Sequence, residues 1–173
     1  ISTIYNPINI NEILIKSTLN KDLNFSKKEF NLIYTGRLSV QKNVLLLVDI
    51  IKNIKNLNIK LRIIGNGEHY NELKRKIKLY NLKNKIEIID FQKNPYPYIK
   101  NSDLFLLPSK WEGFGHVIAE SILLDTPVIA INTIGIAPIF FKSNYFKLIE
   151  NENLENLSKN IKKSIVSFKN NKI

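Results

Sequence analysis

Short apolar runs alternate with longer amphipathic segments along most of the chain. The runs are rich in β-branched residues and bounded by Gly, Pro or Asp, which is typical of β-strands. We predict five strands, at Phe30–Thr35, Lys60–Ile64, Lys85–Asp90, Leu104–Pro108 and Pro127–Ile131. The unbroken apolarity of the last two indicates strands covered on both faces, as in a parallel sheet.

Between these runs, apolar residues recur at helical spacing. Helices are predicted at Lys42–Asn56, at Glu68–Leu82, after the turn-rich Asn94–Tyr98, at Gly115–Leu124 and from Leu154 to Phe168. Residues 1–28 show a less regular pattern. The alternation predicts right-handed crossovers and an α/β fold, a doubly wound, mostly parallel sheet with helices on both faces. We expect residues 1–173 to form a single domain.

Ligands of such sheets bind just beyond the carboxyl ends of the strands, so the loops there are the places to look for chemistry. The loop after the first strand holds Gly36, Arg37 and Lys42. Glycine allows close backbone approach, and an arginine fork with a mobile lysine suits a diphosphate. The alternative is a structural ion pair for Arg37 and a Lys42 that merely opens a helix.

Gly65-Asn66-Gly67 follows the second strand. The third glycine of the dinucleotide fingerprint is absent, since residue 70 is Tyr, and no acidic ribose partner is clear downstream. An ordinary strand-to-helix turn explains the motif better, and we do not expect a nicotinamide or flavin cofactor.

The densest signal follows the fourth strand, where Glu112 and Glu120 flank the turn Gly113-Phe114-Gly115. The turn opens a helix and offers free N–H groups that suit phosphate or sugar oxygens. Two carboxylates that can serve hydroxyls, beside positive charge that can serve phosphates, indicate a nucleotide-sugar site. The alternative is one glutamate as a helix cap and the other in solvent.

The two histidines carry less weight. His116 could be a general base, but a spacer at the pocket edge is the better interpretation because no carboxylate partner is fixed by the sequence. His69 is expected on the surface. No His/Asp cluster has metal-ligand spacing, so we expect no metal.

The composition points first to a polyanionic partner, because 26 Lys and Arg face 15 Asp and Glu, a net charge of +11. Only Arg37, Arg62 and Arg75 are arginines, and the lysines are scattered. We therefore favour a solvated lysine surface over a nucleic-acid site. The absence of cysteine excludes disulfides. No methionine is present, even at position 1, so we expect an excised piece of a longer protein.

Several motifs occur in the order found in a known family. They are Gly36-Arg37-Leu38 with Lys42-Asn43, Phe91–Tyr98, Ser102–Ser109, Glu112-Gly113-Phe114-Gly115 with Glu120, and Thr126–Ala130. Together they resemble group 1 glycosyltransferases, the retaining family 4 type with the GT-B fold. The opening Ile4–Pro7 is similar to the hinge where the family's C-terminal domain begins.

This resemblance implies a Rossmann-like donor-binding half of a GT-B enzyme that transfers a hexosyl unit from a nucleotide-diphosphate sugar with retention. Arg37 and Lys42 would hold the diphosphate, and Glu112 would contact the donor sugar near the reacting centre. Residues Gly113 to Val117, His116 included, would bind sugar and phosphate at the turn, Glu120 would hold the ribose hydroxyls, and Gly36, Phe91 and Gln92 would complete the donor site.

The resemblance further implies no metal and a glycan or glycolipid acceptor bound through an N-terminal domain that is absent here. The isolated domain is then expected to be nearly inactive. We expect surface polysaccharide or lipopolysaccharide synthesis in the bacterial cytoplasm, with contact to the anionic inner membrane. The sequence departs from the family at Asp125 and at Ile134–Pro138, which keeps one glycine and lacks a glutamate. A non-catalytic nucleotide-binding module and a basic nucleic-acid-binding domain are the alternatives.

Overall fold

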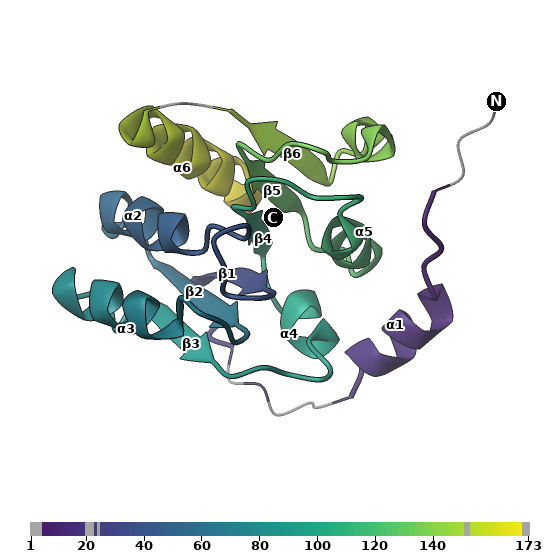
Figure 1. The fold of residues 1–173 in the computed structure, drawn as a ribbon, viewed down its shortest axis with the longest axis horizontal. Helices are drawn as coiled ribbons and strands as arrows, with labels where there is room; N and C mark the ends of the chain where they lie inside the picture. The colour runs from purple at the N-terminus through teal and green to yellow at the C-terminus, as the bar shows by residue number, and fades with distance from the viewer. Residues whose placement is uncertain (1–4, 20–22, 24, 151–152, 171–173) are drawn as a thin grey trace.

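The computed structural model describes residues 5–19, 23, 25–150 and 153–170. A parallel sheet with the strand order β3-β2-β1-β4-β5-β6 forms its centre (Figure 1). The strands are β1 (Phe30–Thr35), β2 (Ile59–Ile64), β3 (Ile86–Ile89), β4 (Leu104–Leu107), β5 (Val128–Ile131) and β6 (Phe146–Ile149). The predicted α/β fold with a doubly wound parallel sheet is confirmed.

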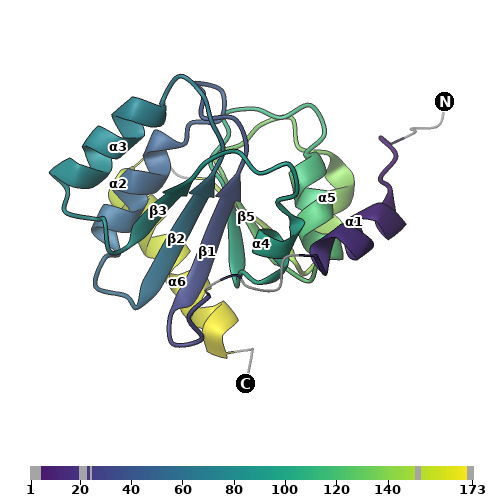
Figure 2. The same ribbon diagram turned by 90° about the horizontal axis from the view of Figure 1, so that it is seen from below.

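Helices cover both faces of this sheet (Figure 2). One face carries α2 (Leu45–Asn53), α3 (Tyr70–Leu79) and α6 (Leu154–Asn170). The other carries α1 (Ile10–Ser17), α4 (Tyr96–Lys100), α5 (His116–Leu123) and the 3-10 helix η1 (Pro138–Lys142). Within the described residues, no helix has the length and apolarity that a membrane span needs.

The sheet separates two apolar layers, and alternate residues of a strand enter different layers. Leu104 and Leu106 of β4 pack in the layer of α2, α3 and α6, while Phe105 and Leu107 pack in the layer of α4 and α5. All four are fully or almost fully buried. This two-sided burial explains why the apolar runs in the sequence have no polar alternation.

Three elements were not predicted: β6, α1 and η1. The strand β6 is missing from the five-strand expectation; it is a four-residue edge strand in which exposed Lys147 interrupts the apolar pattern. The helix α1 lies in the segment expected to be irregular. It has an ordinary helical N-terminus, since the side chain of Asn9 accepts a hydrogen bond from the Glu12 N–H at 3.2 Å. Both expectations were wrong.

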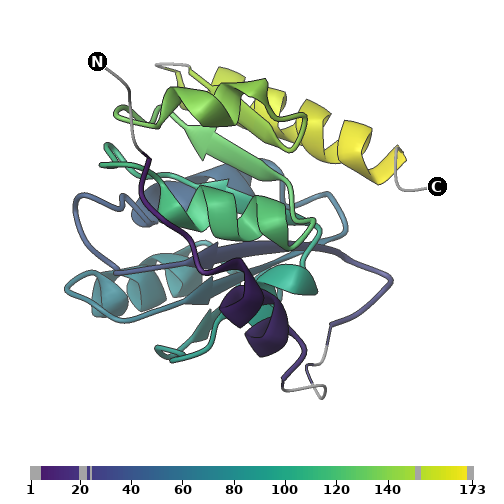
Figure 3. The ribbon, with the colours of Figure 1, turned by 90° about the vertical axis from the view of Figure 1, so that its right-hand side faces the viewer.

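The strand order reverses between β1 and β4, which lie side by side. The chain leaves β1 toward α2 on one face and leaves β4 toward α5 on the other, so the two loops diverge at the carboxyl edge (Figure 2). A crevice is expected at such a switch point. The segment before α1 runs alongside α5 (Figure 3), and Tyr5 there packs against Phe114 with 6.1 Å between ring centroids.

Candidate functional site

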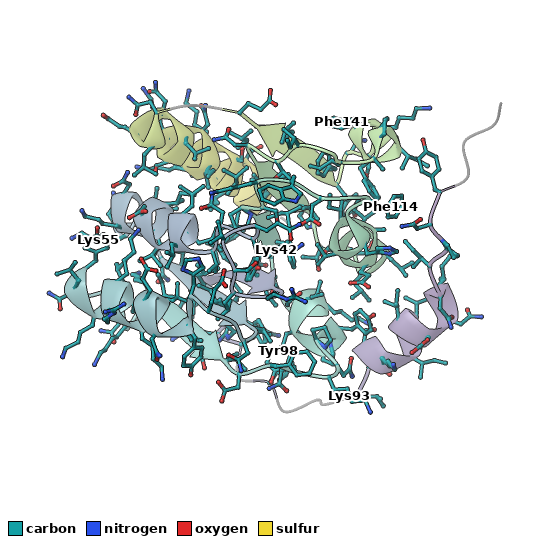
Figure 4. The ribbon with its side chains drawn as sticks, in the orientation of Figure 1. Lys42, Lys55, Lys93, Tyr98, Phe114 and Phe141 are labelled. Carbon is teal, nitrogen blue, oxygen red and sulfur yellow. The ribbon has the colours of Figure 1, made fainter. Side chains whose placement is uncertain are left out.

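A cleft of about 600 Å³ opens at the switch point. It collects nine of the predicted site residues from the loops after β1 and β4 and from α5. They are Gly36, Lys42, Glu112, Gly113, Phe114, Gly115, His116, Val117 and Glu120. Figure 4 marks Lys42 near the middle of the molecule and Phe114 beside α5.

A smaller pocket of about 320 Å³ adjoins the cleft. It is lined by Gly36, which the two pockets share, and by Arg37, Phe91 and Gln92. Every residue predicted for the site therefore lies at one of two adjoining pockets along the carboxyl edge. The roles assigned to these residues remain predictions.

Lys42 and Glu112 join the two loops across the switch point. The ammonium Nζ of Lys42 donates to both carboxylate oxygens of Glu112, at 2.7 and 3.0 Å. The Glu112 side chain is only 10% exposed, so this ion pair is largely shielded from solvent. Lys42 and Glu112, which were predicted to bind different parts of the donor, are thus in direct contact.

The turn from Gly113 to Val117 offers unused backbone donors. Gly115 adopts a left-handed conformation with φ of 95° and caps α5, which begins at His116. Among the described residues, no hydrogen bond uses the N–H groups of residues 113 to 117. A Cβ placed on Gly113 would meet no atom within 4 Å, so its backbone faces open space. Such free N–H groups at a helix start suit an anion.

Glu120 lies deeper in the cleft, on α5, and accepts a hydrogen bond from the Tyr96 hydroxyl at 3.3 Å. Burial raises the pKa of the Glu120 carboxyl, although the Tyr96 hydrogen bond and nearby His116 oppose the change. Burial and the Glu120 charge raise the pKa of Tyr96 to about 12, so its hydroxyl stays a donor. The Glu120 carboxylate is thus a hydrogen-bond acceptor within the cleft, to which two neighbouring hydroxyl groups of a ligand could donate.

Tyr34 closes the floor of the cleft. Its ring is fully buried, and its hydroxyl donates to the carbonyl oxygen of Arg37 at 2.9 Å. Burial, and secondarily the charge of Glu112, raise the pKa of Tyr34 well above its usual value. Because the hydroxyl remains protonated, it holds the backbone of Arg37 in place at the junction of the two pockets.

His116 is tied to the segment before α1. Its Nε2 lies 3.1 Å from Nδ2 of Asn6, which also lines the cleft. The ring also packs edge-on against Phe114, with 5.1 Å between centroids. Glu120, on the same helix, is near enough to interact electrostatically with His116. The interpretation of His116 as a spacer stays a prediction. Ile4, at the start of the predicted hinge, lies outside the described residues.

Gly135 lies directly against the backbone of Glu112. A Cβ on Gly135 would lie 2.2 Å from the Glu112 carbonyl oxygen, and φ of 79° there favours glycine. The Glu112 N–H donates to the Ile134 carbonyl at 2.9 Å. The one glycine kept in the divergent Ile134–Pro138 segment is therefore the one that the Glu112 backbone requires.

Close backbone approach also explains the Gly65-Asn66-Gly67 turn. A Cβ on Gly65 would lie 1.9 Å from the carbonyl oxygen of Gly36, so the loops after β1 and β2 touch. Gly65 and Asn66 line the smaller pocket in addition to leading toward α3. The interpretation as an ordinary turn was therefore incomplete. His69, expected on the surface, has a side chain only 19% exposed and lies 3.0 Å from the Glu72 carboxylate.

Asn6, Tyr34 and Tyr96 were not predicted as site residues. Tyr34 could have been found as a phenol within a buried apolar strand, because a buried hydroxyl needs a partner. Nothing local to the sequence marks Asn6. Within the described ranges, no group of three or more His, Cys, Asp and Glu could hold a metal ion.

The sequence matches the family described as "Glycosyl transferases group 1" over residues 15–169. It is 35% identical over 125 residues to the amylovoran biosynthesis glycosyltransferase AmsD of Erwinia amylovora, covering 72% of this chain and 36% of that protein. It is 34% identical over 155 residues to the capsular polysaccharide biosynthesis glycosyltransferase CapH of Staphylococcus aureus, covering 84% and 41%.

Among solved structures, a mutant of S. aureus TarM in complex with fondaparinux, alpha-GlcNAc-glycerol and UDP superposes with a TM-score of 0.73. The sequences are 20% identical, and the match covers 86% of this chain and 31% of TarM, so it shows the fold alone. The chain spans between 27% and 42% of the length of the curated relatives it matches. The chain belongs to the glycosyl transferases group 1 family and corresponds to the family's C-terminal domain.

Proposed function

We propose that this chain binds the donor of a glycosyltransferase, a nucleotide-diphosphate sugar whose hexosyl unit is transferred with retention of configuration. One observation carries the proposal: a lysine, a run of free N–H groups and the half-buried carboxylate of Glu120 share one cleft at the switch point. The lysine and N–H groups suit a diphosphate, and the carboxylate suits ribose hydroxyls. Because the chain belongs to a glycosyltransferase family, we expect the ligand that contains both the diphosphate and the ribose to be a nucleotide sugar.

In this proposal, Lys42 and the turn at residues 113–117 bind the diphosphate, with Arg37 at the neighbouring pocket. The bond from the sugar to the diphosphate breaks, and the negative charge that develops on the leaving phosphate is stabilised by these groups. Glu112 exchanges part of its contact with Lys42 for a hydroxyl of the donor sugar. Phe91 and Gln92 border the base, and Glu120 accepts the ribose hydroxyls.

The proposal extends to the acceptor of the sugar. The acceptor is a growing surface polysaccharide or glycolipid, held mainly by a part of the enzyme outside these 173 residues. These residues alone would then bind donor but turn it over little.

We propose a metal-independent reaction, because Lys42 and Arg37 supply the positive charge. We also propose a cytoplasmic location beside the anionic inner membrane, consistent with the net charge of +11.

The test is a screen of UDP- and GDP-linked hexoses with the longest natural polypeptide that contains this sequence. We expect one donor to be consumed with release of its nucleoside diphosphate, in the presence of EDTA, and a product that keeps the anomeric configuration by NMR. Donor binding without hydrolysis or transfer would favour a non-catalytic nucleotide-binding module. No nucleotide binding, with tight and steeply salt-dependent DNA or RNA binding, would favour the nucleic-acid alternative.

A further inference from the structure

Trp111 is the only tryptophan of the sequence, and it lies immediately before Glu112. Its side chain is 48% exposed, although large aromatic rings usually contribute to a core. Its neighbour across an isolated parallel bridge is Ile134, which is 66% exposed. The fold therefore leaves about half of the Trp111 side chain and two thirds of the Ile134 side chain exposed to solvent.

The backbone under Trp111 is held firmly. Its carbonyl oxygen accepts a hydrogen bond from Nε2 of Gln41 at 3.1 Å. On either side, the Lys110 N–H donates to the Gln41 carbonyl at 2.8 Å, and the Ile134 N–H donates to the Lys110 carbonyl at 3.1 Å. Because its backbone is fixed from the loops after β1 and β5, the exposed ring is presented in a defined place, as a binding surface requires.

The features of the carboxyl edge follow the order of the strands. The smaller pocket lies beyond β1 and β2, the cleft lies between β1 and β4, and the Trp111–Ile134 bridge joins the loops after β4 and β5. Under the proposed function the base, the diphosphate and the donor sugar occupy the first two in that order. The bridge is therefore the next surface beyond Glu112, where an acceptor would approach the donor sugar.

We propose that Trp111 and Ile134 form a platform on which a sugar ring of the acceptor stacks, so that this domain contributes an acceptor contact of its own. This inference rests on the proposed function. The C–H groups on one face of a pyranose are weakly positive and match the negative face of the indole. Lys110, the preceding residue, is also exposed.

Size favours a sugar over a protein surface. A stable protein interface buries about 800 Å² on each partner. A platform of two side chains is far smaller, and the residues next to it, Lys110 and Asn132, are polar and exposed. One pyranose ring covers such an area.

The single tryptophan makes the test direct. With the cleft saturated by UDP, this chain is titrated with methyl glycosides and disaccharides of glucose, galactose and N-acetylgalactosamine while tryptophan emission is recorded. We expect a saturable change for at least one of these sugars. Saturation-transfer NMR should then show contacts to ring protons on one face of that sugar, retained in Trp111→Phe and weakened about tenfold in Trp111→Ala.

Two controls separate the explanations. UDP affinity should stay within about twofold of wild type in Trp111→Ala. Phe141→Ala, which removes another exposed aromatic ring at η1 (Figure 4), should change neither ligand. If UDP binds but no sugar changes the emission, this inference fails while the proposed function stands; if UDP does not bind, the proposed function fails. The same emission is then measured in the longest natural polypeptide that contains this sequence, without sugar. If acrylamide does not quench Trp111 there, the ring lies in a protein interface and the proposal is overturned.

Discussion

At the residue scale, Lys42 and Glu112 form an ion pair within the cleft. Glu112 is nearly buried, so the ion pair has a structural role. A diphosphate brings more negative charge to Lys42 than one carboxylate, and a sugar hydroxyl can then satisfy Glu112. The Lys42–Glu112 pair therefore serves both the stability of the fold and the proposed binding of the donor.

A pair of variants separates these two roles. Lys42→Met leaves the Glu112 carboxylate without its cation and should lower the free energy of unfolding by about 1–3 kcal/mol. Lys42→Met with Glu112→Gln removes both charges and should recover most of that loss in denaturant unfolding. Both proteins should bind UDP at least about tenfold more weakly in calorimetry, since each lacks the lysine. Recovery of UDP binding in the double variant would limit Lys42 to a structural role.

Glu120 carries a second prediction, on pH. Its pKa is raised in the folded state, so its charge destabilises the fold above that pKa and has no effect well below the unfolded value. Glu120→Gln keeps an acceptor for Tyr96 without the charge. We expect the variant to be more stable than wild type near neutral pH, by less than about 1 kcal/mol for this partly solvated group. The difference should vanish as the pH falls below the ordinary range of glutamate. An advantage that instead grew in acid would contradict this account.

At the element scale, the parts that could be predicted were those with two-sided burial or special turns. The apolar runs predicted β1 and β4, and the turn Gly113-Phe114-Gly115 predicted the start of α5. The pairing of β1 with β4, which creates the switch point, was not predicted from the sequence. The short strand β6 was not predicted, although β3 at the other edge of the sheet was. The contact of Asn6 with His116 joins residues far apart in sequence, so no local pattern predicts it.

The loop that carries Gly135 makes the third prediction. Gly135→Ala forces a Cβ against the Glu112 carbonyl at a left-handed φ, so it should lower the free energy of unfolding by about 1–3 kcal/mol. It should also weaken UDP binding, because Glu112 and the turn after it shift. Chemical denaturation and calorimetry measure the two effects. Wild-type stability in this variant would mean that the loop does not support Glu112.

At the scale of the whole molecule, the charge of +11 is not concentrated at the cleft. Lys42 is paired with Glu112, and Arg37 lies at the adjoining pocket. We therefore expect UDP affinity to fall only a few-fold between low and physiological salt. A polynucleotide site with six to ten phosphate contacts would lose about 10³–10⁵ in affinity over a similar range. Filter binding of single-stranded DNA should show no comparable affinity.

The most direct test of the donor cleft is calorimetric titration with UDP of the wild-type chain and of Gly113→Ala. A Cβ at Gly113 meets no protein atom within 4 Å, so the variant should unfold at the wild-type temperature. The methyl group would enter the space given to the diphosphate, so we predict one UDP per wild-type chain and at least about tenfold weaker binding in the variant. Equal UDP affinity in the two proteins, or no binding to wild type, would contradict a diphosphate site at this turn.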